Sequence, residues 1–130
     1  CSRFYKTAPV DYLDQDWFVN AAVKVTTRFD AHGLLDALIG IQRRAGRHGD
    51  SIRFGPRIID LDIIFYDETV IETPDLLIPH PRLHKRRFVL QPICDIDPAI
   101  VHPILKKNVR ALLERLDDDA QSVEPICCDC

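Results

Sequence analysis

The stretch that decides the fold is RFGPRIIDLDIIFY, residues 53–66. It reads as a Gly-Pro turn followed by a strand rich in isoleucine, with aspartates at positions 60 and 62. Because side chains alternate faces along a strand, Asp60 and Asp62 point the same way, opposite to Ile59, Leu61, Ile63 and Phe65. The pattern therefore predicts a strand over 57–66 with one buried apolar face and one face that carries two carboxylates.

The paired carboxylates favour a site for a metal ion and phosphate. Mg²⁺ prefers carboxylate oxygens that it can share with substrate phosphates, and arginines bind the same phosphates. Five arginines precede or flank the pair, in a chain whose net charge is −3: Arg43, Arg44, Arg47, Arg53 and Arg57. A local positive field in an acidic chain indicates an anionic ligand rather than a nucleic-acid surface. The alternative is that both acids are simply solvated surface groups.

Length and composition indicate one ordinary globular domain. The 130 residues are 46% hydrophobic and 28% charged, which suits a folded chain with a modest core. No apolar run reaches membrane-spanning length, and the first residues lack the apolar core of a signal peptide. Three of the five cysteines fall in the last four positions, CCDC, which is neither a disulfide framework nor a familiar zinc motif. We therefore expect a cytoplasmic, reduced protein.

Periodicity predicts the order of elements. We expect a short strand over 3–7, a long strand over 17–27, and a helix that begins after Asp30 and continues to Ala45 before Gly46. An arginine-rich loop, 47–56, precedes the strand with the two aspartates. A polar turn at 67–68 then leads into a strand over 69–73, forming a hairpin.

The second half of the chain predicts two more helices. One covers about 82–90 and has a basic side, and the last begins after Asn108 with leucines at helical spacing. Beyond Leu116 the acidic run and the cysteines predict loss of order. The expected organisation is one domain over 1–116 and a poorly ordered tail over 117–130.

Four segments together resemble one known family. They are FYKTAP (4–9), FVNAA (18–22), RFGPRIIDLDIIFY (53–66) and IPHPRLHKRRFVLQPI (78–93). In this order they resemble 6-hydroxymethyl-7,8-dihydropterin pyrophosphokinase of folate biosynthesis, over residues 4 to about 103. The resemblance implies a diphosphotransferase that moves pyrophosphate from ATP to the hydroxymethyl group of a reduced pterin and releases AMP.

The same resemblance implies roles for single residues. Asp60 and Asp62 would bind two Mg²⁺ ions that bridge the ATP phosphates and the attacking hydroxyl. Arg47 would close over the site with the 47–56 loop, and it would act in catalysis together with Arg57 and the two aspartates. The implied ATP-binding residues are Arg57, Ile63, His80 and Arg86. Taken alone, His80 could equally be a turn residue.

The resemblance also implies a pterin pocket. Phe18 and Phe88 would sandwich the flat bicyclic ring, and Asn20 would read its amide edge because a carboxamide both donates and accepts hydrogen bonds. The remaining lining residues would be Thr7, Pro9 and Val10. The alternative for either aromatic ring is ordinary packing in the core.

The implied fold is α+β, with a ferredoxin-like antiparallel sheet and helices packed on it. Relative to that pattern, the first β-α unit is absent from this chain, so the strands over 17–27 and 57–66 would lack a central partner. A fragment, a processed chain or another chain that supplies the unit would each explain this. Gln42 stands where the family often has glutamate, which removes a negative charge near the arginines.

Three functions remain open from the sequence. The first is the pterin pyrophosphokinase, alone or joined to other folate-pathway domains. The second is a non-catalytic module that binds ATP or pterin, and the third is a Mg²⁺-dependent phosphohydrolase. The expected partners are ATP and the reduced pterin, without nucleic acid or membrane.

Overall fold

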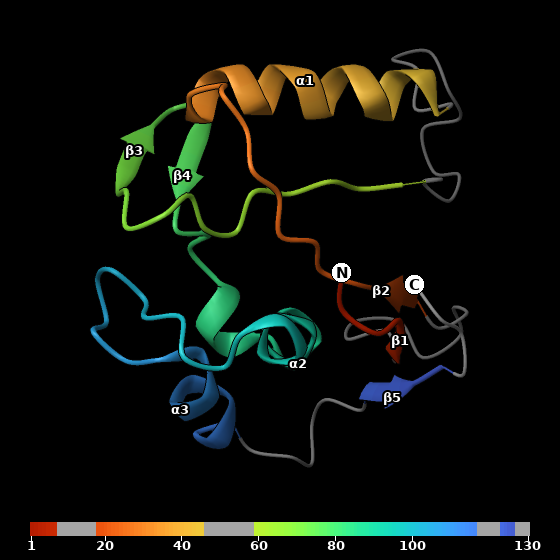
Figure 1. The fold of residues 1–130 in the computed structure, drawn as a ribbon, viewed down its shortest axis with the longest axis vertical. Helices are drawn as coiled ribbons and strands as arrows, with labels where there is room; N and C mark the ends of the chain where they lie inside the picture. The colour runs from red at the N-terminus through yellow and green to blue at the C-terminus, as the bar shows by residue number, and fades with distance from the viewer. Residues whose placement is uncertain (8–17, 46–58, 117–122, 127–130) are drawn as a thin grey trace.

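The computed structural model describes residues 1–7, 18–45, 59–116 and 123–126. These residues form an α+β fold of two small antiparallel sheets, three α-helices and a single 3₁₀ turn (Figure 1). The predicted loop over 47–56 and the helix-ending Gly46 lie outside the described residues.

Helix α1 (Ala31–Arg44) confirms the predicted helix almost to the residue. The Asp30 carboxylate caps it by accepting a hydrogen bond from the Gly33 backbone N–H at 2.7 Å. Such a cap satisfies one of the amides that the first turn leaves without a helical partner. Arg43 and Arg44 lie in the last turn, where positive charge favours the helix dipole.

One sheet has β1 (Tyr5–Thr7) at its centre, between β2 (Phe18–Asn20) and β5 (Val123–Pro125). Both pairings are antiparallel, and Tyr5 lies opposite Asn20 on one side and Pro125 on the other. Strand β5 was not predicted, because a three-residue strand gives little periodicity to detect.

The other sheet is a hairpin of β3 (Ile71–Thr73) and β4 (Leu76–Ile78), with Ile71 opposite Ile78. The polar turn at 67–68 is present, since the Thr69 N–H donates to the Tyr66 carbonyl at 3.0 Å. The predicted partner of this strand was wrong: β3 pairs with the following strand, not with 57–66.

Two predicted strands are corrected by the structure. Residues 59–66 form no strand, because no other described strand pairs with them in a ladder. The predicted strand over 17–27 is reduced to the three residues of β2. Val19, Val23 and Val25, which the spacing would place on one face of such a strand, are exposed at 61%, 65% and 59%. Val19 lies in β2 and pairs with Lys6 of β1, whereas residues 21–27 belong to no strand.

Two apolar cores hold the described residues together. The first joins the 3₁₀ turn (Leu83–Lys85), α2 (Arg87–Ile96) and α3 (Val109–Glu114). Its buried members are Leu83, Leu90, Ile93, Val109 and Leu112. The second lies between α1 and the β3–β4 hairpin and contains Ala31, Ile63, Leu76 and Ile78. Figure 1 shows the hairpin beside the N-terminal end of α1, and α2 and α3 next to each other in another part of the molecule.

The two helices predicted for the second half of the chain are present, although the first of them differs in extent from the prediction. Asn108 caps α3 as expected, its side-chain oxygen accepting from the Ala111 N–H at 2.8 Å. The helix expected over 82–90 is divided into the 3₁₀ turn and α2, and α2 continues to Ile96 with Pro92 inside it.

Residues 63–65 connect the two cores. Ile63 is buried in the core beneath α1, whereas Ile64 and Phe65 pack against the core of α2 and α3. The two aspartates directly precede this connection. They therefore lie on a segment that is anchored to both halves of the described structure, although it forms no sheet.

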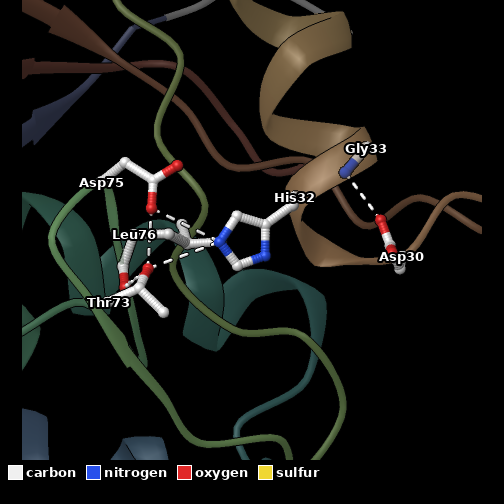
Figure 2. A network of polar contacts seen from close by, with 6 residues as sticks. All are labelled: Asp30, His32, Gly33, Thr73, Asp75 and Leu76. Carbon is white, nitrogen blue, oxygen red and sulfur yellow. Dashed lines mark hydrogen bonds and ion pairs between the residues drawn. The ribbon is translucent and has the colours of Figure 1, made fainter.

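A polar network also joins α1 to the hairpin (Figure 2). His32 Nε2 lies 3.4 Å from both Thr73 Oγ1 and Asp75 Oδ1, and the Thr73 hydroxyl donates to Asp75 at 2.8 Å. The hydrogen bond from Thr73 lowers the pKa of the Asp75 carboxyl, with a smaller contribution from His32. All of these contacts are solvent-exposed, so they add little stability beyond that of the second core.

His102 is buried and closes the loop between α2 and α3. Its Nδ1 accepts the backbone N–H groups of Ile104 at 3.1 Å and Leu105 at 3.0 Å. Accepting two donors at Nδ1 requires that nitrogen to be unprotonated. Burial lowers the pKa of His102, and the neighbouring His84 lowers it further.

We expect the free energy of unfolding to fall as the pH drops below about 6.5, the unperturbed histidine value. The unfolded chain binds a proton there that folded His102 resists, so acid favours the unfolded state, by at most about 1.4 kcal/mol per pH unit for one proton. The His102→Asn variant keeps an acceptor for the two amides but cannot titrate. Urea denaturation from pH 7.5 to 5 should show a smaller loss in the variant. Equal losses of stability in the unaltered chain and in His102→Asn would contradict this role for His102. Comparing the two chains also cancels the contribution of His80, which both of them carry.

Among the described residues, no helix combines the length and the apolar character needed to cross a bilayer. Cys94 is a free, half-buried thiol, whereas Cys1 is disulfide-bonded. The disulfide at Cys1 differs from the fully reduced state expected from the sequence.

Candidate active site

Asp60 and Asp62 are both exposed, while Ile63, the next residue, is buried. The alternation predicted for this segment therefore holds at the aspartates even without a sheet. Two backbone contacts position the segment. The Leu61 N–H donates to Gln42 Oε1 of α1 at 2.7 Å, and the Ile64 carbonyl accepts the His80 N–H at 3.0 Å. The carboxylates thus lie between α1 and the end of the β3–β4 hairpin.

His80 follows the cis Ile78–Pro79 bond and is half-buried beside this segment. Its Nδ1 accepts the Arg82 backbone N–H at 3.2 Å, which leaves Nε2 to carry the proton of the neutral ring. Burial lowers the pKa of His80; the Asp62 carboxylate opposes this shift, while Arg86 and Arg82 add to it. His80 is therefore a neutral N–H donor at pH 7, within the electrostatic reach of one acid and two arginines.

Arg86 and Phe88 lie together where α2 begins. The guanidinium carbon of Arg86 is 5.5 Å from the centroid of the Phe88 ring, a cation–π distance. Both side chains are half-buried. One face of the Phe88 ring is therefore covered by a cation.

Strand β2 holds Asn20 in the sheet that contacts α2. Asn20 is half-buried and pairs with Tyr5, and both β1 and β2 contact α2, the helix that carries Phe88. Tyr5 is fixed to α2 by its hydroxyl, which donates to Asp95 at 2.5 Å. Burial and this hydrogen bond raise the pKa of Tyr5 to about 12, so the phenol stays protonated and the sheet stays attached to the helix.

The structure thus brings the predicted residues into two groups. Asp62, His80 and Arg86 interact electrostatically, and Asp60 lies two residues from Asp62. Asn20 and Phe88 lie on neighbouring elements. The predicted Pro9, Val10, Arg47 and Arg57 are outside the described residues, and only the backbone is described for Thr7 and Phe18.

Two residues of the site were missed from the sequence. From the sequence, Gln42 is distinctive only as a neutral residue where the family often has glutamate. In the structure its side chain accepts a hydrogen bond from the backbone between the two aspartates. Arg82 was not assigned a role, although its charge reaches His80. The signal for Arg82 was its place in the basic run PRLHKRR, while nothing local connects position 42 with position 61.

A divalent cation fits the chemistry of Asp60 and Asp62. Two exposed carboxylates on one side of a segment supply the hard oxygen ligands that Mg²⁺ takes when phosphates complete its coordination. Within the described ranges there is no cluster of three or more histidine, cysteine or acidic residues that would hold a metal by itself. The pair therefore suits a cation that arrives with a phosphate ligand.

Comparison with known proteins places the chain in a family. The family model described as 7,8-dihydro-6-hydroxymethylpterin-pyrophosphokinase (HPPK) matches residues 1–98. A 2-amino-4-hydroxy-6-hydroxymethyldihydropteridine pyrophosphokinase of Methylorubrum extorquens is 40% identical over 116 residues, covering 89% of this chain and 72% of that protein.

Longer relatives match as well. The folic acid synthesis protein FOL1 of Dictyostelium discoideum is 45% identical over 104 residues, covering 80% of this chain and 16% of its own length. A mitochondrial folate synthesis bifunctional protein of Arabidopsis thaliana is 50% identical over 95 residues, covering 73% of this chain and 17% of its own length. The chain thus spans less than a fifth of either longer relative. The extent of the family match, together with the identity to the bacterial relative, shows that this chain belongs to the 7,8-dihydro-6-hydroxymethylpterin-pyrophosphokinase family.

Proposed function

We propose that this chain transfers the β,γ-diphosphate of ATP to the hydroxymethyl oxygen of 6-hydroxymethyl-7,8-dihydropterin in folate biosynthesis. The hydroxymethyl oxygen bonds to the β-phosphorus, the bond from that phosphorus to the α–β bridging oxygen breaks, and AMP leaves with that oxygen. Family membership and the names of the relatives support this reaction. The observation that carries it is the exposed Asp60–Asp62 pair, with Asp62 and Arg86 both within electrostatic reach of His80.

In this proposal Asp60 and Asp62 hold Mg²⁺, which when bound neutralises the phosphate charge and lowers the pKa of the attacking hydroxyl. The chain's own contribution is to hold both carboxylates outward on a segment fixed at Leu61 and Ile64. Fixed acids suit phosphoryl transfer because this chemistry depends on positioning and charge neutralisation more than on covalent catalysis.

The basic side of the site would bind the phosphates. His80 offers a neutral Nε2–H donor, which binds a phosphate oxygen without adding a charge that varies near pH 7. Arg86 is held over Phe88 and would add charge-assisted hydrogen bonds, as would Arg57. Ile63 would line the nucleotide side. Arg47 would close over the site with its loop, excluding water that competes with the pterin hydroxyl.

The pterin would lie against β2 and the start of α2. Phe88 and Phe18 would stack on the two faces of the ring, and Asn20 would pair with its amide edge. Thr7, Pro9 and Val10 would complete the pocket. We also propose the ferredoxin-like arrangement as the organisation in which 17–27 and 57–66 gain a partner strand, as the family resemblance implies.

The test is release of AMP from ATP and Mg²⁺, with and without 6-hydroxymethyl-7,8-dihydropterin. The proposal expects AMP only when the pterin is present. Release of phosphate or AMP at the same rate with and without the pterin would indicate a phosphohydrolase. Binding of ATP or pterin without turnover, in a folded sample, would indicate a binding module instead.

Replacing Phe88 with alanine should weaken pterin binding by about tenfold, because one stacked aromatic face contributes on the order of 1 kcal/mol or more. Nucleotide affinity should change little, since Arg86 keeps its charge when the ring beneath it is lost. Isothermal titration with each ligand separately checks this, and Phe88→Leu controls for lost apolar volume. An equal loss for both ligands would contradict the stacking role.

A further inference from the structure

The side chain of Gln42 connects helix α1 to the backbone between the two aspartates. Gln42 is only 8% exposed, and its Oε1 accepts the Leu61 N–H at 2.7 Å. That N–H belongs to the peptide group that joins Asp60 to Leu61. The orientation of this peptide plane helps to set the direction of the backbone at both Asp60 and Asp62. The hydrogen bond from Leu61 to Gln42 therefore influences where the two carboxylates point.

The contact matters because this segment lacks the hydrogen bonds of a sheet. In a strand, backbone amides are held by a neighbouring strand, and the side-chain directions follow from that ladder. Residues 59–66 form no strand in the part of the chain that is described, and the Leu61 N–H donates to a side chain. At Leu61 the buried side-chain amide of Gln42 therefore accepts the hydrogen bond that a neighbouring strand would accept in a sheet.

The neutrality of the glutamine also bears on the site. An acceptor next to two carboxylates could itself be an acid, but a third negative charge would repel both of them. The amide accepts the same hydrogen bond and adds no net charge. A buried side-chain acceptor near the end of α1 therefore orients the aspartates without altering the charge that they present.

We propose that Gln42 is a positioning residue: it holds the Asp60–Leu61 peptide so that both carboxylates face one divalent cation. This inference rests on the proposed function, because it assumes that the aspartates bind a cation together with nucleotide. It assigns part of the cation affinity to a residue on α1 that does not touch the cation.

The test compares Gln42→Met, which removes the acceptor at nearly constant size, with Gln42→Glu, which keeps it. Hydrogen exchange followed by NMR reports the Leu61 amide directly and needs no substrate. Electron paramagnetic resonance measures the affinity of Mn²⁺ in the presence of α,β-methylene-ATP. The matched control is Gln91→Met, the same change in a half-buried glutamine of α2.

We expect Gln42→Met to weaken Mn²⁺ binding by about 10–100-fold, the range seen when a group that orients a metal ligand is lost. The Leu61 amide should exchange faster, while amides within α1 keep their protection. Gln42→Glu should keep the protection of the Leu61 amide, because its carboxylate still accepts that hydrogen bond, and Gln91→Met should change neither the Leu61 exchange nor the affinity for Mn²⁺.

Unchanged Mn²⁺ affinity in Gln42→Met would overturn the proposal, as would unchanged Leu61 exchange. If Gln42→Met does not fold, Gln42→Glu decides: a folded variant that loses Leu61 protection contradicts the acceptor role. Absence of Mn²⁺ binding in the unaltered chain would overturn both this inference and the proposed metal site. Mn²⁺ binding that depends on Gln42 without pterin-dependent AMP release would overturn the proposed function alone.

Discussion

Replacing Asp60 or Asp62 with asparagine should lower kcat/KM for pyrophosphoryl transfer by about a thousandfold or more, since a metal-held charge supplies several kcal/mol of transition-state stabilisation. Asparagine keeps the size and one oxygen of the side chain but removes the negative charge that a divalent cation requires. Both positions are exposed, so the free energy of unfolding should change by less than about 0.5 kcal/mol. Steady-state kinetics and urea denaturation, taken together, separate the two effects.

The control for these variants is Glu72→Gln, which neutralises an exposed carboxylate on β3. It should leave both activity and stability near the values of the unaltered chain. If either aspartate variant instead unfolds while Glu72→Gln does not, the pair has a structural role. Full activity in both aspartate variants would show that the cation is held elsewhere.

Replacing Leu83 with alanine should lower the free energy of unfolding by about 2–5 kcal/mol, the usual range for a large-to-small change in a core. Leu83 is 0% exposed and packs in the core formed with α2 and α3. It also lies between His80 and Arg86, so loosening the 3₁₀ turn should raise the KM for ATP. A small domain has roughly 5–15 kcal/mol of stability in total, so this single change removes a large part of it.

Leu77→Ala is the matched control, because Leu77 on β4 is 45% exposed. It should cost less than about 1 kcal/mol. Urea titration measures both variants, and an unchanged slope with denaturant shows that only stability has moved. Equal, small effects of the two substitutions would mean that the packing around Leu83 is not a stabilising core.

Helices with local start signals were predictable from the sequence. Asp30 and Asn108 each cap a helix through an amide three residues later, a contact within one short segment. The strands were harder. Strands β4 and β5 have three residues each, and which strands pair depends on segments far apart in the chain: β5 joins β1 across more than a hundred residues.

The strand predicted over 57–66 shows the limit of periodicity. Its alternation correctly placed Asp60 and Asp62 outward and Ile63 inward. A strand also needs a neighbour, and no sequence pattern within the segment reports whether one is there. One of the contacts that hold the segment comes from Gln42, nineteen residues earlier, on a helix face that periodicity alone assigns to packing.

For the site, the family resemblance named the acids, His80 and Arg86, and the structure places Asp62 and Arg86 within electrostatic reach of His80. The sequence could not show that Arg86 covers one face of Phe88, or that Arg82 contributes to the field at His80. Both interactions depend on the geometry with which the 3₁₀ turn joins α2. The spacing of the basic residues in PRLHKRR does not reveal that geometry.

The most direct measurement follows the phosphate itself. ATP labelled at the γ-phosphorus is incubated with Mg²⁺, the chain and 6-hydroxymethyl-7,8-dihydropterin, and the products are separated. Pyrophosphoryl transfer predicts that the label appears in the pterin diphosphate in a one-to-one ratio with unlabelled AMP. Label recovered only in inorganic phosphate or pyrophosphate, with no labelled pterin, would contradict the proposed function.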